Sequence, residues 1–226
     1  MVRSSITMPK DLPFWEAPAQ VERFASLEPD NLLLELLTEH RNTDRLWALD
    51  LGCAGGRNTE ALVRAGCQTV AIDLSVAMSG TTRDRLAQLG RSRTRPPIVI
   101  RSRFDKLPVA SGRFDLVVAI GIYIQANSDA ELCAGLSETC RVLKPGGRVF
   151  VAMWSTQTLP ADARRVEGQR FVYASQPGER RCRLNQEELL DLMARTGMFP
   201  DRSITTRHPI RDGRPHESLV GVFVKR

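Results

Sequence analysis

The stretch that most constrains the fold is a glycine-rich turn, residues 52–56, between an apolar run and a helical pattern. The apolar run covers residues 46–51, and the helical pattern starts at residue 59. Three glycines within five residues allow backbone conformations closed to other residues and let a ligand lie directly against the main chain. The following helix directs its unpaired N–H groups and positive dipole end toward that ligand. The sequence therefore predicts a strand, a binding turn and a helix.

Apolar runs and helical patterns alternate along the chain around this turn. The expected strands are residues 46–51, 69–72, 98–100, 114–120 and 148–153, with helices over 75–88 and 128–143 among the connections. Uniformly apolar strands are typical of a sheet that is covered on both faces, and parallel neighbours need a crossover connection. The pattern predicts an α/β fold, namely a Rossmann-like doubly wound sheet with helices on both faces.

The chain length favours one domain. A chain of 226 residues can bury one good core and is short for two, so we expect a single domain over residues 1–226. Its parts would be an N-terminal helical segment (1–45), a core (46–153), an insertion (154–184) and a C-terminal helix and hairpin (185–226). The regular pattern fails over 154–184, and a stretch of that length indicates a functional cover. The final hairpin is indicated by Asp212-Gly213, between strands expected at 203–206 and 218–224.

Three helix starts are visible in the sequence. Pro29 occupies a position that proline favours, and a helix would run from it to about residue 40. Ser128 with Glu131 and Asn185 with Glu188 each fit a capping box.

Composition narrows the partners and the compartment. The net charge is +6, but only four of the 32 basic residues are lysine, so 28 are arginine, a skew that a GC-rich genome produces without selection for binding. We therefore do not expect a nucleic-acid partner. No run approaches the roughly 18 apolar residues of a membrane span, and residues 1–10 lack the apolar core of a secretory signal. Five cysteines without a Cys-x-x-Cys pair disfavour a disulfide framework and a zinc site. We expect a cytoplasmic monomer or homodimer, with no metal and no membrane contact.

Two acids determine which ligand suits the turn. Asp50 ends the strand just before the glycines, where it would repel a pyrophosphate and attract an ammonium group. Asp73 ends the next expected strand, where an acid can accept both hydroxyls of a ribose. A ligand with a ribose and an ammonium group but no phosphate is S-adenosylmethionine.

Several segments follow the order and spacing of a known family. They are residues 50–56 (Asp-Leu-Gly-Cys-Ala-Gly-Gly), 71–73 (Ala-Ile-Asp), 107–108 (Leu-Pro), 114–118 (Phe-Asp-Leu-Val-Val) and 141–147 (Arg-Val-Leu-Lys-Pro-Gly-Gly). With them the chain resembles the class I S-adenosylmethionine-dependent methyltransferases over roughly residues 46–153, and is weakly similar to the tellurite-resistance-type small methyltransferases. The resemblance implies a seven-stranded sheet with the last strand antiparallel. It implies S-adenosyl-L-methionine as the methyl donor and S-adenosyl-L-homocysteine as a product.

The resemblance also implies where the cofactor binds. Gly52 would contact the methionine amino group and Asp73 the ribose, while adenine would lie between Leu74 and the turn near Phe104. The expected cofactor-binding residues are Asp50, Gly52, Cys53, Ala54, Gly56, Asn58, Asp73, Leu74, Arg103, Phe104, Asp105 and Ile120.

Two positions depart from the family pattern. Arg103 stands where many members carry an acid that accepts from the adenine amino group, and arginine has no acceptor to offer. Either Asp105 substitutes through a shifted turn, or stacking and backbone contacts hold the adenine. Ala54 replaces the middle glycine, which is tolerable if its φ is negative.

Acceptor-binding groups are expected after the strands at 114–120 and 148–153, because open α/β sheets bind ligands at the carboxyl ends of their strands. Tyr123 and Gln125 would orient a polar acceptor; alternatively they cover the sheet end and cap the next loop. His208 is a candidate base or a solvated hairpin residue. The expected substrate-binding residues are Trp15, Tyr123, Trp154, Arg181 and Arg183, although the aromatic N-terminus can instead pack on the sheet edge and the arginines can simply be solvated.

The main hypothesis is methyl transfer to a small molecule by in-line displacement in a lid-covered pocket. A second is methylation of RNA or protein, with the arginine-rich surface 83–103 as a docking patch. A third is a non-catalytic protein that only binds S-adenosylmethionine.

Overall fold

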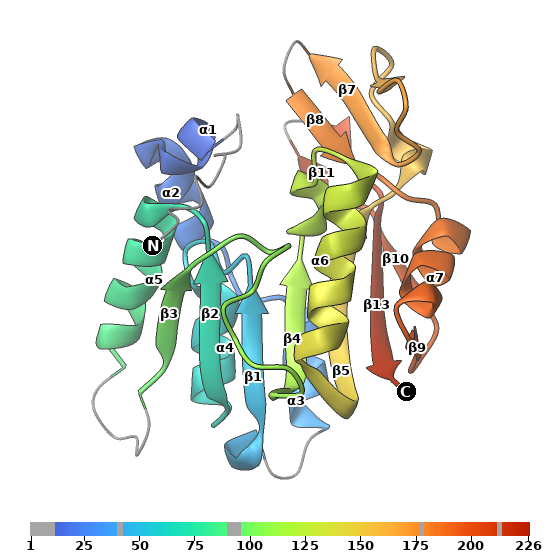
Figure 1. Ribbon diagram of the computed structural model, residues 1–226. Helices are drawn as coiled ribbons and strands as arrows, with labels where there is room; N and C mark the ends of the chain where they lie inside the picture. The colour runs from blue at the N-terminus through green and yellow to red at the C-terminus, as the bar shows by residue number, and fades with distance from the viewer. Residues whose placement is uncertain (1–11, 40–42, 90–95, 177–178, 212–213) are drawn as a thin grey trace, which may run out of the picture.

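The computed structural model describes residues 12–39, 43–89, 96–176, 179–211 and 214–226, and its centre is an eight-stranded sheet (Figure 1). Seven strands lie in the order β10-β13-β5-β4-β1-β2-β3, and β9 also pairs with β13. Their bounds are β1 (Trp47–Leu51), β2 (Gln68–Asp73), β3 (Ile98–Arg101), β4 (Phe114–Ile120), β5 (Leu143–Trp154), β9 (Met198–Pro200), β10 (Thr205–Arg207) and β13 (Ser218–Lys225). The helices are α1 (Leu12–Glu16), α2 (Pro18–Ala25), α3 (Asn31–Thr38), α4 (Arg57–Arg64), α5 (Val76–Ala87), α6 (Asp129–Val142) and α7 (Gln186–Arg195), with 3-10 turns η1 (Thr43–Arg45), η2 (Tyr123–Gln125) and η3 (Thr156–Thr158).

The strand directions are those of the predicted Rossmann-like sheet. Strands β3, β2, β1, β4 and β5 are parallel neighbours, whereas the last strand, β13, is antiparallel to β5, β9 and β10. The α/β fold with an antiparallel last strand is therefore confirmed. Strand β9 brings the sheet to eight strands instead of seven; with three residues it is too short to show a periodic pattern in the sequence.

Helices bury both faces of the sheet, which explains the uniformly apolar strands. Alternate residues of each strand face opposite sides, so Val117 and Val151 pack with α6 and α7, while Val118 and Phe150 pack with α3 and α4. Figure 1 shows α6 and α7 in front of the sheet and α3 and α4 behind it. The two apolar cores hold the parallel strands together, so their carboxyl ends form one edge.

Two of the predicted helix starts need correction. Helix α3 begins at Asn31, because Asp30 is its N-cap and accepts from Leu32 N, so Pro29 precedes the helix. Ser128 caps α6 by accepting from Glu131 N, but the Glu131 carboxylate accepts from Asn127 N and not from the cap residue, which leaves the box half formed. The second box is complete, since Asn185 and Glu188 satisfy each other's backbone N–H.

The insertion contains a small antiparallel sheet, β6 (Arg164–Arg165), β7 (Val172–Gln176) and β8 (Glu179–Cys182). Figure 1 shows β7 and β8 beyond the carboxyl ends of the central strands, with α1 and α2 above the other half of that edge. A hairpin of β11 (Ile210–Arg211) and β12 (Arg214–Pro215) precedes β13; the predicted turn residues Asp212 and Gly213 lie outside the described residues. None of the described helices combines the length and the apolar character that crossing a bilayer requires.

Candidate functional site

The glycine turn has a geometry that side chains would obstruct. Gly52 and Gly56 have φ of 76° and 80°, values that favour glycine. A Cβ on Gly52 would lie 2.9 Å from the Ile122 Cβ, and one on Gly56 would lie 3.0 Å from the Thr82 hydroxyl. Gly56 is the N-cap of α4, so the helix N-terminus opens directly from the turn. The turn can therefore bring a ligand directly against the main chain.

Ala54 corrects the expectation of a negative φ. Its φ is 47°, which makes it the one non-glycine residue with positive φ in the described part of the chain. Its N–H donates to Asp73 Oδ2 at 2.9 Å, and its carbonyl accepts from the Thr82 hydroxyl at 2.7 Å. These two bonds hold the alanine in a conformation that costs an L-residue about 1 to 2 kcal/mol. The strain lies in the binding turn itself.

Asp50 is a buried acid that lacks a cationic partner among the described residues. It is 2% exposed and accepts from the Thr59 hydroxyl at 2.5 Å. Burial raises its pKa to about 6, although the Thr59 bond and the Arg57 charge act in the opposite direction. An ammonium group beside it would remove part of the cost of that charge.

Asp73 sits at the end of β2 with its carboxylate fixed. Oδ1 accepts from Ser75 N and Oδ2 from Ala54 N, each at 2.9 Å. Burial raises its pKa against the effect of these N–H groups. An ionised carboxylate accepts about four hydrogen bonds, so Asp73 keeps some capacity to accept from a ribose hydroxyl beside its backbone partners Ala54, Leu74 and Ser75. Leu74, half-buried, follows it and accepts from Arg101 Nε through its carbonyl at 2.9 Å.

Three other predicted cofactor residues lie in the supporting structure around the turn. The buried Cys53 places its Sγ 3.5 Å from the Thr82 hydroxyl, and the buried Asn58 accepts from Asp30 N at 3.0 Å. Ile120, at the end of β4, packs against the core beneath. The structure brings all three to the turn, where their contacts are with protein atoms.

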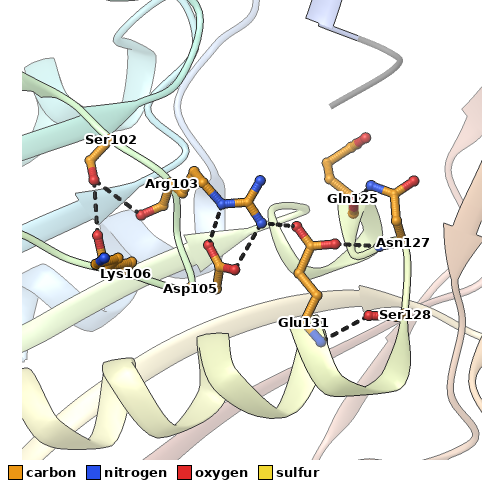
Figure 2. Close-up of polar contacts among 8 residues, drawn as sticks. All are labelled: Ser102, Arg103, Asp105, Lys106, Gln125, Asn127, Ser128 and Glu131. Atoms are coloured by element: carbon orange, nitrogen blue, oxygen red, sulfur yellow. Dashed lines mark hydrogen bonds and ion pairs between the residues drawn. The ribbon is translucent and has the colours of Figure 1, made fainter. Parts of the chain in front are cut away.

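The loop predicted to hold adenine is organised by an ion-pair cluster, shown in Figure 2. Arg103 donates from Nε and Nη2 to the two carboxylate oxygens of Asp105 at 2.8 Å, and from Nη2 to Glu131 at 2.7 Å. Bonding to Asp105 raises the pKa of Arg103. Asp105 therefore neutralises the arginine, which disfavours the expectation that it substitutes for the missing adenine acceptor. The sequence predicts only a capping role for Glu131, because it does not reveal that this loop lies against α6.

Phe104 anchors the same loop in the core. It is 8% exposed, meets Tyr123 edge to face at 6.0 Å between ring centroids, and fills the space that a Cβ on Gly135 would need. Its side chain is thus a structural support of the loop.

Tyr123 corrects the prediction of an acceptor-orienting phenol. The side chain is 1% exposed, and its hydroxyl lies 2.5 Å from the Thr139 hydroxyl. Burial raises its pKa far above the usual 10. The structure therefore does not bring the Tyr123 hydroxyl to the carboxyl edge, and the alternative of a tyrosine covering the sheet end fits this placement.

Gln125 ends η2, directly after β4. It is half-buried, and its Oε1 is buried without a hydrogen-bond partner among the described residues. Figure 2 shows its side chain pointing away from the cluster of Arg103 and Glu131. An unpaired buried amide oxygen costs roughly 1 to 3 kcal/mol, so this atom suits a donor from a ligand.

Trp154 and Arg183 come together at the end of β5. The guanidinium carbon of Arg183 lies 4.7 Å from the ring centroid of the half-buried Trp154. Arg181 lies on β8 and pairs with Glu179 at 3.2 Å, so it belongs to the cover. His208 is exposed beyond β10, and no described residue forms a hydrogen bond or ion pair with it that would activate it as a base, which agrees with the solvated alternative.

The N-terminal helices rest on the turn and on the start of α5. Trp15 packs against Phe14 and Phe24, and its carbonyl accepts from the Ser75 hydroxyl at 3.2 Å. The Glu16 carboxylate accepts from Val76 N at 2.7 Å and from Ala77 N at 3.0 Å, which caps α5 beside Asp73. The role of Glu16 cannot be predicted from the sequence, because a cap supplied from 60 residues away leaves no local pattern.

Part of the chain matches a known protein family. Residues 48–147 match the family described as "Methyltransferase domain". The chain is 28% identical over 137 residues to a ubiquinone biosynthesis O-methyltransferase of Methylococcus capsulatus, a match that covers 61% of this chain and 54% of the relative. It is 35% identical over 112 residues to a demethylmenaquinone methyltransferase of Clavibacter sepedonicus, covering 50% and 42%.

A solved structure shares the fold over nearly the whole chain. It is the 1,6-didemethyltoxoflavin-N1-methyltransferase of Burkholderia thailandensis, crystallised with 1,6-didemethyltoxoflavin and S-adenosylhomocysteine. The TM-score is 0.67 at 18% identity, covering 99% of this chain and 93% of that one. The chain spans about half the length of the curated relatives it matches, with 54% and 42% in the two cases above.

Proposed function

We propose that the chain, whose residues 48–147 match the methyltransferase-domain family, transfers the methyl group of S-adenosylmethionine to a small-molecule acceptor. The observation that carries this proposal is the pair of acids around the glycine turn. Asp50 and Asp73 are both raised in pKa by burial, and the main chain between them takes positive φ at Gly52, Ala54 and Gly56. This arrangement suits a ligand that is cationic at one end and carries a ribose.

The residues present fit the cofactor. Asp50 would hold the ammonium group, the Asp73 carboxylate would accept from the ribose hydroxyls, and the turn would lie against the methionine part. When bound, the cofactor supplies an electrophilic methyl carbon, whose bond to sulfur breaks, with the electron pair left on sulfur, as the acceptor's lone pair attacks. The acceptor's proton leaves to water, so the protein chiefly aligns the acceptor and excludes competing solvent.

Two segments would cover such a site. Helix α2 contacts the turn closely, since a Cβ on Gly55 would lie 2.6 Å from the Ala25 backbone, and α1 contacts the start of α5 through Glu16. The small sheet of β6, β7 and β8 lies over the other half of the edge (Figure 1). A pocket closed by these segments favours in-line displacement on a small acceptor.

A small molecule is favoured over RNA or protein. The two curated relatives described above are named for ubiquinone biosynthesis and for demethylmenaquinone, which are small molecules, whereas another relative is named a cypemycin N-terminal methyltransferase. Four arginines of the region 83–103 make contacts within the chain, which leaves them poorly suited to docking: Arg83 with Val99 O, Arg85 with Glu60, Arg101 with Leu74 O and Arg103 with Asp105. Residues 90–95 lie outside the described part. The cytoplasmic location and the monomeric or homodimeric state stay predictions.

Calorimetry tests the cofactor assignment. S-adenosylmethionine and S-adenosylhomocysteine should bind the wild-type chain, and Asp73→Asn should weaken both by about 1 to 3 kcal/mol through the altered ribose bonds. Asp84→Asn, an exposed acid on α5, is the matched control and should change nothing. No binding by the wild-type chain would contradict the proposal. Binding without release of S-adenosylhomocysteine on any acceptor in a broad screen would favour a non-catalytic binding protein.

A further inference from the structure

Arg183 is the one arginine that is fully buried in the described part of the chain. It is 3% exposed, and its Nη1 donates to the carbonyls of Ser155 at 3.2 Å and Thr158 at 3.3 Å. Burial lowers its pKa to about 10, while the charge of Glu179 acts in the opposite direction. Glu179 itself pairs with Arg181. The guanidinium thus has carbonyl partners but no paired carboxylate within the described residues.

A buried cation without a counter-charge is costly. Removing a charge from water costs several kcal/mol unless an ion pair and further hydrogen bonds compensate. Two carbonyls engage one nitrogen of Arg183. Guanidinium groups carry five N–H donors in a fork that matches a carboxylate. An incoming carboxylate would therefore supply the compensation that the chain lacks.

The position of Arg183 ties this charge to the acceptor end of the sheet. The next residue, Leu184, bonds to Trp154 through its N–H and to Thr156 through its carbonyl, each at 3.1 Å. Arg183 therefore lies beside the carboxyl end of β5, with its guanidinium over the Trp154 ring. Open α/β sheets bind their ligands at that end.

Gln125 lies on η2, which follows β4, the strand next to β5 in the sheet. Both β5 and β8 pack against η2, and Arg180 on β8 reaches Asn127 O at 3.5 Å. The buried, unpartnered Gln125 Oε1 therefore belongs to the same end of the sheet as Arg183. It can accept from a hydroxyl or amino group of a ligand, and that group is also the type that a methyl donor modifies.

We propose that the acceptor is an aromatic carboxylic acid that carries a hydroxyl or amino group. Arg183 binds its carboxylate, the half-buried Trp154 lies beside its ring, and Gln125 Oε1 accepts from the group to be methylated. This inference rests on the proposed function, because it assigns the acceptor of the same site.

Matched acids and amides test the proposal. The probes are 4-hydroxybenzoate and 1-hydroxy-2-naphthoate, each compared with its uncharged amide, titrated into the full chain with and without S-adenosylhomocysteine. We expect at least one acid to bind tenfold or more tightly than its amide. Arg183→Gln should abolish this preference, and Arg183→Lys should retain part of it. Arg180→Gln, which removes an exposed charge from the same small sheet, is the control and should keep the wild-type preference.

The outcomes separate the two proposals. Binding of S-adenosylhomocysteine without any acid preference would overturn the Arg183 assignment and leave the methyltransferase proposal standing. An acid preference that depends on Arg183, without binding of S-adenosylhomocysteine, would support the Arg183 assignment and contradict the methyltransferase proposal. If Arg183→Gln does not fold, the wild-type comparison of acid and amide decides, because equal affinities or no binding of any acid would still overturn the proposal. Gln125→Leu should weaken the hydroxylated acids by threefold or more while leaving benzoate unchanged.

Discussion

The turn after β1 and the wall formed by Gln125, Trp154 and Arg183 lie at the same edge of the sheet, but different interactions shape them. At the turn, positive φ angles and bonds between the main chain and Asp73 set the geometry within about two dozen residues. At the wall, Arg183 contacts Trp154, and Gln125 lies on η2, which packs against β5 and β8, so the three residues are separated by up to some 60 residues of sequence. The turn is preorganised by local sequence, whereas the wall exists only once the chain has folded.

The two regions also share a property. Each contains a buried charge that the protein does not fully compensate, Asp50 at the turn and Arg183 at the wall. Such charges destabilise the folded chain and suit ligands of opposite sign. Binding at this edge should therefore stabilise the protein. Removing either charge should raise the stability of the free protein and weaken ligand binding.

The largest expected effect concerns Asp50. Its pKa rises from 3.8 to about 6 on folding, so the folded chain binds this proton more tightly than the unfolded chain does. Its contribution to the free energy of unfolding therefore falls as the pH rises from about 4 to about 6, by about 3 kcal/mol in total. Asp50→Asn should be more stable than the wild type by up to about that amount at pH 7, with the advantage disappearing near pH 4.

Urea unfolding at several pH values measures this difference. The same variant should bind S-adenosylmethionine more weakly at pH 7, because it lacks the charge that attracts the ammonium group. A variant that is less stable than the wild type at every pH would show that the Thr59 bond outweighs the burial of the charge. The buried charge of Asp50 would then not destabilise the folded chain in the way that is inferred for Arg183.

The next effect tests whether the turn depends on its cover. In Gly55→Ala the new Cβ would lie 2.6 Å from the Ala25 backbone, so α2 must move or the turn must distort. We expect a loss of about 2 kcal/mol in the free energy of unfolding, typical of overpacking. Gly80→Ala in α5 meets nothing within 4 Å and should instead stabilise the chain by about 0.5 to 1 kcal/mol. Equal effects of the two variants would mean that α2 is not held on the turn.

The contrast between the two regions explains what the sequence could predict. The strands, the turn and the two acids follow from apolar runs and short spacings. The sequence of residues 46–153 therefore predicts the fold and the residues expected to bind the methyl donor. The wall cannot be predicted, because Gln125, Trp154 and Arg183 share no characteristic spacing, and the sequence does not reveal that Tyr123 is buried. The strands β6, β7 and β8 are two to five residues long, and β6 and β8 are rich in arginine, so these strands lack a sustained apolar alternation of the kind that marks a half-buried strand.

A smaller effect is expected at Ala54. Glycine there would keep the bonds to Asp73 and Thr82, since both use the main chain, and would remove the cost of a positive φ. Relief of strain exceeds the entropy that glycine adds to the unfolded chain, so Ala54→Gly should raise the free energy of unfolding by about 1 kcal/mol. Thermal unfolding measures this shift. A destabilised Ala54→Gly variant would imply that the alanine relaxes to negative φ in solution.

The smallest effect separates the cover over the turn from the cover over the wall. Glu16 caps α5 with two bonds from an exposed edge of α1, and a carboxylate at a helix N-terminus contributes about 0.3 to 1 kcal/mol. Glu16→Gln keeps an acceptor but loses the charge, so the N-terminal helices should detach more often. S-adenosylhomocysteine should then dissociate about twofold faster in stopped-flow measurements, with the melting temperature nearly unchanged. Glu22→Gln, an exposed acid on α2, is the control. If Glu16→Gln instead changed the acid-over-amide preference assigned to Arg183, the two halves of the edge would be coupled. The turn and the wall would then not bind their ligands independently, although different interactions shape them.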